Sequence, residues 1–481
     1  MCAAVPSGPP RPFGMRILAA TAVGPSDQGT GMQDNPQNAS EPEVDARSDA
    51  AAAALYDTLE LAIRHLDRGE PALALPLLEQ AVGSAPDFPF AVRLLADAKR
   101  ELGDFEAAET EYKLAMVLDP NVSGVDLGLG LVMLATGRLD EAAQHLAKAV
   151  AADANLWPSL HDLGTALLVA GRPADAMLAF HAIREVAPVA EGMALKGIGH
   201  CLRAMGRDDD ALAAYRAATE AQPDLAEAHE NLAAVLYASG RVDEAVQAVR
   251  TWLAALPNDP VAAHLAGALG AANRPSAASA AYIRATFDRQ ALHFDQAQAR
   301  VDYCVPTLIA AKVAGLLNPE PAGLDIVDIG CGTGLSGAVL RPWARTLVGL
   351  DLSPGMLEIA RARGIYDRLE LTEAQTFLQA HPATYDLITA ADVLVYAGDL
   401  DGWVRSLAGA LRAGGAVAAS VETHDGPEPW RLLASGRYSH AVPPLVAAFE
   451  EAGLTVRSVE PAVLRKERGT AVEGTVLIAV K

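Results

Sequence analysis

The chain has 481 residues, a formal net charge of −22 and 51% hydrophobic residues. That apolar content excludes a chain that is disordered throughout, and the length fits about three domains or one domain with a repeat array. The acidic balance disfavours nucleic acid as a partner, because a negative surface repels a phosphate backbone. Apolar runs are too short to span a bilayer, so we expect no membrane partner either.

The first 52 residues are predicted to be a disordered leader, because residues 24–50 are rich in Gly, Asp, Asn, Pro and Ser. The apolar run from Ile17 to Val23 is too short for a convincing signal peptide. Four cysteines are scattered without zinc spacing or a disulfide pattern. We therefore expect a cytoplasmic location and no metal site.

A helical repeat with a period of 34 or 35 residues occupies about residues 53–290. Each unit reads as a helix, a turn and a second helix, with Gly ending the first helix and a small Ala letting the two helices approach. A weaker seventh unit has Asn273 in place of Gly, with Ala278 and Tyr282 at the expected positions. The six regular units are marked by Gly69, Gly103, Gly137, Gly171, Gly206 and Gly240, by Ala74, Ala108, Ala142, Ala176, Ala211 and Ala245, and by the larger apolar residues Leu78, Tyr112, Leu146, Phe180, Tyr215 and Val249.

This pattern resembles the tetratricopeptide repeat (TPR). The resemblance implies an all-α solenoid, six to seven repeats long, whose concave groove binds a peptide or a protein. The acidic balance of the array favours a basic partner. The alternative is a scaffold that orients or dimerises the C-terminal domain.

The pattern changes at Leu324, where apolar strands begin to alternate with helices. Strands are expected at residues 324–328, 346–351, 369–374, 385–390 and 414–422, with a closing pair at 454–460 and 474–481. This alternation predicts a Rossmann-like, doubly wound parallel sheet with an antiparallel C-terminal edge. We assign this α/β domain to residues 291–481.

The loop after the first strand has the spacing Asp328-x-Gly330-x-Gly332-x-Gly334. The stretch Gly332–Gly337 also spells the GxGxxG fingerprint of dinucleotide enzymes, and such an enzyme would share the acidic residue Asp351. The longer frame resembles motif I of class I methyltransferases that use S-adenosylmethionine (SAM). Asp328 and the pair Glu373-Ala374 favour the methyltransferase interpretation over the dehydrogenase one.

The resemblance implies that SAM binds here and leaves as S-adenosylhomocysteine (SAH). Asp328 would face the methionine end, Asp351 the ribose hydroxyls, and Glu373 and Ala374 the adenine. The expected SAM-binding residues are Tyr303, Asp328, Gly330, Cys331, Gly332, Gly334, Asp351, Leu352, Met356, Glu373, Ala374 and Ala391. Residues 287–306 are expected to form an amphipathic lid helix over this site.

Residues that bind the methyl acceptor are expected after the fourth and fifth strands. They are Asp392, Tyr396, Arg437, Tyr438 and His440. Whether a general base is used stays open, with His424, Tyr438 and His440 as candidates. The acceptor, a small molecule or a protein methylated on O, N or C, also stays open.

The combination of a tetratricopeptide array with this domain resembles bacterial proteins described as predicted methyltransferases containing such repeats. The domain itself is similar to small-molecule methyltransferases of the ubiquinone and biotin-pathway type. We therefore predict a SAM-dependent methyltransferase with a protein-binding array. The alternative is a non-catalytic adaptor whose methyltransferase-like domain binds SAM without consuming it.

Overall fold

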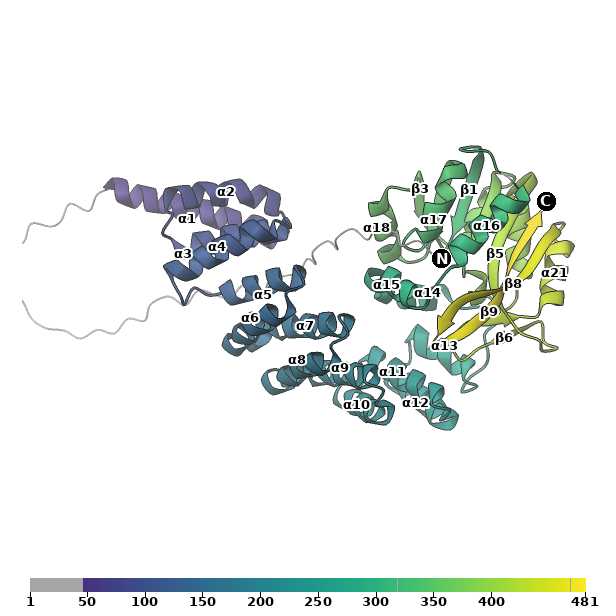
Figure 1. Cartoon of the computed structure of the whole chain (residues 1–481), viewed down its shortest axis with the longest axis horizontal. Helices are drawn as coiled ribbons and strands as arrows, with labels where there is room; N and C mark the ends of the chain where they lie inside the picture. Colours follow the sequence, from purple (N-terminus) through teal and green to yellow (C-terminus); the bar gives the residue numbers. More distant parts are fainter. Residues whose placement is uncertain (1–45, 318, 468) are drawn as a thin grey trace, which may run out of the picture. The chain divides into compact units, whose positions relative to one another are not determined.

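A computed structural model describes residues 46–317, 319–467 and 469–481, and the chain divides into two compact units between Gln222 and Pro223 (Figure 1). The predicted disordered leader lies outside the described residues as far as residue 45. Residues 46–52 already belong to the first helix, α1 (Ala46–Asp67), so the helical region begins before the expected boundary.

The first unit consists of helix pairs that follow the predicted repeats. Two short 3-10 helices, η1 (Ala154–Leu156) and η2 (Pro188–Ala190), precede α7 and α9. The pairs are α1 with α2 (Pro71–Ser84), α3 (Pro89–Glu101) with α4 (Phe105–Leu118), α5 (Val125–Ala135) with α6 (Leu139–Ala152), α7 (Trp157–Val169) with α8 (Pro173–Val186), and α9 (Glu191–Ala204) with α10 (Asp208–Ala221).

The repeat positions read from the sequence are confirmed. The six glycines follow the first helices with φ between 69° and 83°, in the left-handed region that favours glycine. The six alanines are completely buried, and the larger apolar residues are at most 1% exposed. Further glycines make room for them, since a β-carbon on Gly128 would lie 2.2 Å from the Tyr112 ring and one on Gly164 2.7 Å from the Phe180 ring.

The second unit begins with the last two helix pairs, α11 (Ala226–Ala238) with α12 (Val242–Ala255), and α13 (Pro260–Ala268) with α14 (Ala280–Gln290). The seventh repeat differs from the predicted form. The left-handed glycine is Gly270 (φ 75°), and the chain stays in a loop until Ser279, whose side chain caps α14. Tyr282 is buried, at the position that the repeat predicts.

The rest of the second unit is a mixed sheet with the strand order β3-β2-β1-β4-β5-β7-β6. Strands β1 to β5 are parallel, while β9 runs antiparallel to β5 and β8 runs antiparallel to β9. The strands are β1 (Leu324–Ile329), β2 (Ala344–Asp351), β3 (Arg368–Leu371), β4 (Tyr385–Ala390), β5 (Leu411–Thr423), β6 (Trp430–Leu432), β7 (Tyr438–His440), β8 (Thr455–Glu467) and β9 (Thr470–Val480). The predicted α/β fold with an antiparallel edge is confirmed.

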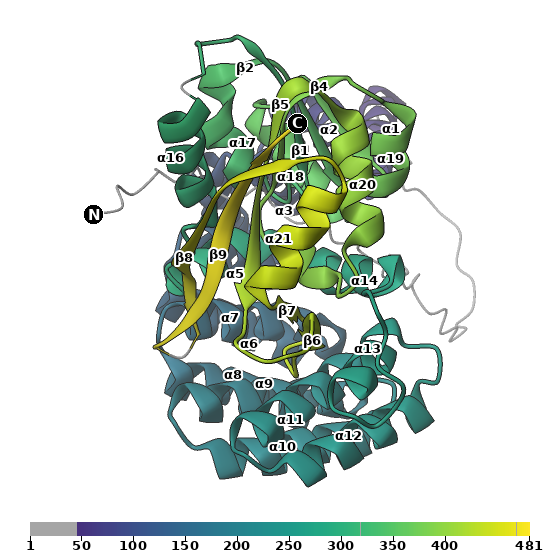
Figure 2. The ribbon, with the colours of Figure 1, turned by 90° about the vertical axis from the view of Figure 1, so that its right-hand side faces the viewer.

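Helices cover both faces of the sheet, with α16 and α17 on one side and α19, α20 and α21 on the other (Figure 2). Strand alternation divides the core between them, because Ile326 packs on the α16 side and Val327 on the α20 side. The α-helices that alternate with the strands are α16 (Val305–Leu317), α17 (Leu335–Leu340), α18 (Pro354–Arg363), α19 (Ala374–Ala380), α20 (Asp401–Ala410) and α21 (Val442–Glu451). Two short 3-10 helices, η4 (Arg341–Trp343) and η5 (Leu394–Tyr396), lie among them.

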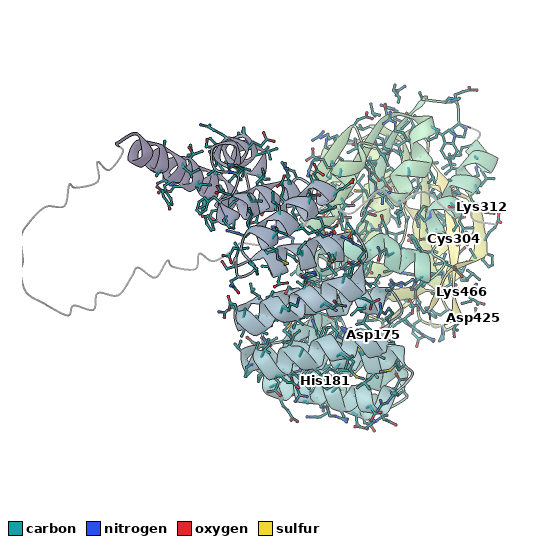
Figure 3. The ribbon with its side chains drawn as sticks, turned by 60° about the vertical axis from the view of Figure 1, so that its left-hand side comes forward. Asp175, His181, Cys304, Lys312, Asp425 and Lys466 are labelled. Atoms are coloured by element: carbon teal, nitrogen blue, oxygen red, sulfur yellow. The ribbon has the colours of Figure 1, made fainter. Side chains whose placement is uncertain are left out.

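The single lid helix expected at residues 287–306 is wrong. The chain forms the end of α14, then η3 (Ala291–His293) and α15 (Phe294–Arg300), and reverses at Asp302 (φ 52°) before α16 begins. Beyond the reversal, α16 is tied to β8, because Lys312 pairs with Glu460 and the Cys304 N–H donates to Leu464 O at 3.3 Å. Figure 3 labels Cys304 and Lys312 on this side of the unit.

The segment between β5 and α21, expected to be an acceptor loop, contains the hairpin β6–β7. Strand β7 pairs with the end of β5 through Glu422 and Ser439. This pairing fixes the direction in which the side chains before and along β7 point. Among the described helices, none is both long and apolar enough to cross a bilayer.

Candidate functional site

The glycine loop lies between β1 and α17. Gly330, Gly332 and Gly334 have φ values of 60°, 55° and 98°, so all three need the left-handed region. A β-carbon on Gly330 would lie only 2.5 Å from Val393 Cγ2 in the loop after β4. The backbone conformation therefore favours glycine at all three positions, and close packing requires it at Gly330.

Asp328, at the end of β1, lies beneath this loop. It is 1% exposed, and its two carboxylate oxygens accept hydrogen bonds of 2.7 Å from the hydroxyls of Tyr366 and Thr389. Burial raises the pKa of Asp328 to about 6, although these two hydroxyls act in the opposite direction. The side chain joins β1 to β4 and to the residues before β3. Its predicted role at the methionine end of SAM stays a prediction.

Asp351, at the end of β2, connects the glycine loop to the next helix. Its carboxylate oxygens accept 2.9 Å hydrogen bonds from the backbone N–H groups of Gly332 and Ser353. Burial raises its pKa, and these backbone donors lower it. Asp351 and Leu352 are half-buried, and Met356 is buried. The hydrogen bond from Gly332 holds Asp351 next to the glycine loop.

The predicted adenine contact after β3 has another partner. Both carboxylate oxygens of Glu373 accept from backbone N–H groups at the start of α19, those of Gln375 at 3.1 Å and Thr376 at 2.7 Å. Glu373 thus caps α19, a role that its identity and position favour independently of SAM. Ala374 is buried beside it.

The end of the repeat array covers the glycine loop. Asp288 on α14 accepts hydrogen bonds from the Ser353 hydroxyl and from the Gly355 N–H. Asp295 on α15 accepts from the Thr333 hydroxyl at 2.6 Å and pairs with Arg363 on α18. Residues of the seventh repeat and of the short helix after it therefore perform the covering role that we expected of a separate lid.

The long loop of the seventh repeat also binds the loop after β4. Ala277 forms an antiparallel bridge with Ala397, and the Ala278 N–H donates to Tyr396 O at 2.8 Å. The Tyr438 hydroxyl donates to Pro275 O at 2.9 Å. The last repeat and the sheet are consequently joined by backbone pairing rather than only by side-chain contact.

A cavity of about 210 Å³ lies where these elements meet. Four aromatic rings line it, and neighbouring ring centroids are 5.7 to 6.4 Å apart. Gln290, Gln298 and Ser435 also line the cavity. The rings are Tyr282, Phe287, Phe294 and Tyr396, and the charged lining residues are Glu230, Arg437 and Glu467.

A network of charges continues from the cavity toward the sheet. Arg465, only 3% exposed, donates to Glu422 at 2.5 Å and to Glu467 at 2.7 Å. Arg437 lies 3.2 Å from Glu467 and 3.4 Å from Glu422. The two guanidinium groups are therefore already engaged by carboxylates of the chain itself.

Asp392 and Tyr303 interact with the charged residues next to the cavity. Asp392 has φ 55°, and its carboxylate accepts from the Ser420 hydroxyl at 2.9 Å. Burial raises the pKa of the Tyr303 hydroxyl well above its usual value, and Asp392 adds to this effect. Tyr303 also interacts electrostatically with Arg437 and Asp328, which places it beside both parts of the site.

The candidate bases lie away from the cavity lining. Tyr438 and His440 are both buried on β7, and His424 bonds to Ser439 and to Glu428 O. Burial lowers the pKa of His440 to about 4. The structure thus places Tyr396 and Arg437 in the cavity lining, whereas Asp392, Tyr438 and His440 do not line it.

Two other predicted residues, Cys331 and Ala391, contribute packing or backbone contacts. Cys331 is a buried free thiol whose N–H donates to Leu350 O at 2.9 Å. Ala391 is half-buried at the end of β4. Glu230, Tyr282 and Phe287 line the cavity but were not predicted to do so, because they belong to the repeats. The only feature of the sequence that pointed to them was the irregular seventh unit.

Comparisons with known proteins agree with this architecture. Residues 327–417 match the family model of a methyltransferase domain. Residues 59–123, 93–156 and 197–260 match the model of the tetratricopeptide repeat. The chain therefore carries tetratricopeptide repeats followed by a methyltransferase domain of the class I fold.

Two curated relatives match the methyltransferase domain. Human methyltransferase-like protein 27 is 40% identical over 110 residues, which are 22% of this chain and 45% of that protein. The ubiquinone biosynthesis O-methyltransferase of Vibrio parahaemolyticus is 31% identical over 103 residues, or 21% of this chain and 44% of that protein. Each match spans less than half the length of the relative.

Among solved structures, this chain is similar to the Burkholderia thailandensis 1,6-didemethyltoxoflavin-N1-methyltransferase, which was crystallised with 1,6-didemethyltoxoflavin and SAH. The likeness covers 41% of this chain and 86% of that one, with 19% identity and a TM-score of 0.34.

Proposed function

We propose that this protein transfers the methyl group of SAM to an acceptor bound in the cavity between the last repeats and the sheet. The observation that carries the proposal is the geometry at the carboxyl ends of β1 and β2. There the loop of three left-handed glycines is joined to Asp351 by the Gly332 N–H, inside the matched methyltransferase domain. Ligands of open α/β sheets bind at this edge.

The residues present fit a methyl donor of this kind. The Asp351 carboxylate accepts two backbone N–H groups, and a carboxylate has about four acceptor positions, so capacity remains for ribose hydroxyls. Asp328 would act indirectly, by holding the glycine loop through Tyr366 and Thr389. SAM supplies an activated methyl group, so the chain's own residues need mainly to position the acceptor and exclude water.

The cavity is the proposed acceptor site, with Tyr396 and Arg437 as binding residues. We do not propose His424, Tyr438 or His440 as the general base, because none of them lines the cavity. Where the acceptor must lose a proton, Glu230 and Glu467 are the carboxylates that line it.

We further propose that the array binds a peptide or protein partner, as the repeat class does. The acidic charge of the chain favours a basic partner. Cys201 and Cys331 are free thiols, which supports a reducing, cytoplasmic setting. A partner bound to the repeats could supply the acceptor group itself or bring the acceptor to the cavity.

The test of the proposed function is a calorimetric titration of SAM and SAH into the full chain. Micromolar binding, about −8 kcal/mol, is expected for the wild type. Asp351→Ala should abolish binding, whereas Asp425→Ala, at an exposed loop position, should not change it. A folded wild type that binds neither compound contradicts the proposal. Binding without consumption of SAM across an acceptor screen would favour the adaptor alternative.

A further inference from the structure

The cavity has the composition of an aromatic cage. Phe287 lies 5.7 Å from Tyr396 and 6.2 Å from Phe294 between ring centroids, and Tyr396 lies 6.4 Å from Tyr282. The Phe287 ring meets both of its neighbours edge to face, at 85° and 65°. Rings gathered around one small volume present negative π faces to a bound group, which favours a cation.

The charges at the cavity favour the same kind of ligand. Glu230 and Glu467 line it together with one cation, Arg437. Arg437 is already within 3.4 Å of both Glu422 and Glu467, so its charge is compensated inside the protein. An anionic ligand would have to compete with these carboxylates, whereas an ammonium group would add a partner for Glu230.

Glu230 is the carboxylate that the repeats contribute. It lies on α11 and pairs with Arg289 of α14 at 3.1 Å. Burial raises its pKa, while Arg289 lowers it. The side chain is one-third exposed, so it can meet a ligand in the cavity while keeping its ion pair.

The size of the cavity limits the ligand. Its volume of about 210 Å³ is the space of roughly seven water molecules. Drug-sized ligands occupy pockets of about 300 Å³ or more. The ligand is therefore a single side chain or a small molecule with about one ring.

We propose that the acceptor is an amine, whose amino group lies between the rings of Phe287 and Tyr396 and the carboxylates of Glu230 and Glu467. This inference rests on the proposed function and names its acceptor class. The bound ammonium first gives a proton to a lining carboxylate or to water. The neutral amine nitrogen then forms a bond to the methyl carbon while the sulfur–methyl bond breaks and its electron pair goes to sulfur. The methylated ammonium then loses a proton to a lining carboxylate or to water.

The test compares three probes that share one ring and differ in charge. Phenethylamine, phenethyl alcohol and hydrocinnamate are titrated by calorimetry into the full chain in the presence of SAH. We expect phenethylamine to bind at least tenfold more tightly than phenethyl alcohol, and hydrocinnamate to bind least. The amide of N-acetyl-lysine tests a protein side chain as the source of the amine, and tighter binding than phenethylamine would indicate a protein acceptor.

Two variants separate the contributions of charge and rings. Glu230→Gln should remove most of the preference for the amine over the alcohol, and Phe287→Leu should weaken amine binding several-fold. Glu450→Gln, on the exposed face of α21, is the matched control and should keep the wild-type preference. The titration with SAH also shows that each variant is folded.

The outcomes distinguish the two proposals. Tightest binding of hydrocinnamate, equal binding of all three probes, or no binding of phenethylamine at millimolar concentration would overturn the amine proposal in a protein that binds SAH. Retention of the full amine preference in Glu230→Gln would overturn the assigned role of that carboxylate. Failure of the wild type to bind SAH would instead contradict the proposed function.

Discussion

The hydroxyl of Tyr438 donates a 2.9 Å hydrogen bond to the carbonyl oxygen of Pro275. It thereby joins β7 of the sheet to the loop of the seventh repeat, 163 positions away in sequence. Tyr438, which we expected to bind the acceptor, holds the last repeat against the sheet. This contact makes the seventh repeat part of the methyltransferase unit.

Tyr438→Phe tests that role. The substitution removes one hydrogen bond and leaves the carbonyl of the half-buried Pro275 without this donor, so we expect a loss of about 1 kcal/mol in unfolding free energy. Urea denaturation of the full chain measures it. Tyr237→Phe, on the exposed part of α11, should change stability by less than about 0.5 kcal/mol. Unchanged stability together with lost activity would instead restore Tyr438 as a catalytic residue.

The glycine loop allows a matched pair of substitutions. Gly330 and Gly364 have nearly equal φ values, 60° and 65°, but only a β-carbon on Gly330 would meet a neighbour, Val393, at 2.5 Å. Gly364→Ala should cost about 1–2 kcal/mol from backbone strain alone. Gly330→Ala adds the clash, about 1–3 kcal/mol more, and should abolish SAH binding.

Thermal unfolding and calorimetry measure both glycine variants. If Gly330→Ala and Gly364→Ala changed stability and SAH affinity equally, the close packing of Gly330 against Val393 would be contradicted.

The covering segment makes a prediction about affinity. Asp288→Asn combined with Asp295→Asn weakens the contacts with Ser353, Thr333 and Arg363, so SAH should bind about tenfold more weakly, a change of about 1.4 kcal/mol. Asp425→Asn serves as the control. Wild-type affinity in the double variant would mean that α14 and α15 do not contribute to donor binding.

His440 makes a prediction about pH. Its pKa is about 4 in the folded chain, below the usual value of 6.5, because the ring is buried. The unfolded state therefore binds more protons between these values, so this group's stabilisation is present above pH 6.5 and is lost as the pH falls toward 4. Its full size is about 3 kcal/mol, since one pKa unit is about 1.4 kcal/mol.

His440→Gln should reduce the fall in unfolding free energy between neutral pH and the acid limit of folding. The measurement is urea denaturation of wild type and variant at a series of pH values, and the quantity compared is the difference between the two curves. A difference that does not change with pH would contradict the buried, neutral state of His440.

Local patterns accounted for much of the fold. The glycines, alanines and larger apolar residues of the repeats were predictable because each position depends on residues less than one repeat away. The same holds for Asp351 and the glycine loop, where spacing alone indicates a strand, a tight loop and a helix. Glu373 was placed correctly after β3, but its carboxylate caps α19.

The acceptor side could not be predicted in the same way. Glu230 and Phe287 line the cavity where the last repeats meet the sheet, and the pairing of Ala277 with Ala397 is one of the contacts between these distant segments. Tyr438 and His440 were expected in an insert after the fifth strand, and the structure places them two positions apart on a short strand, where they share a face. Arg437, just before that strand, is the residue that lines the cavity.

The central claim is that the glycine loop binds SAM and SAH beneath a cover made by the last repeat. Amide hydrogen exchange of the full chain with and without SAH tests it most directly. We predict slower exchange in residues 330–336 and also in residues 284–300, with little change in the first four repeats. Protection of the glycine loop without protection of residues 284–300 would contradict the covering role, and no protection at either segment would contradict the donor site itself.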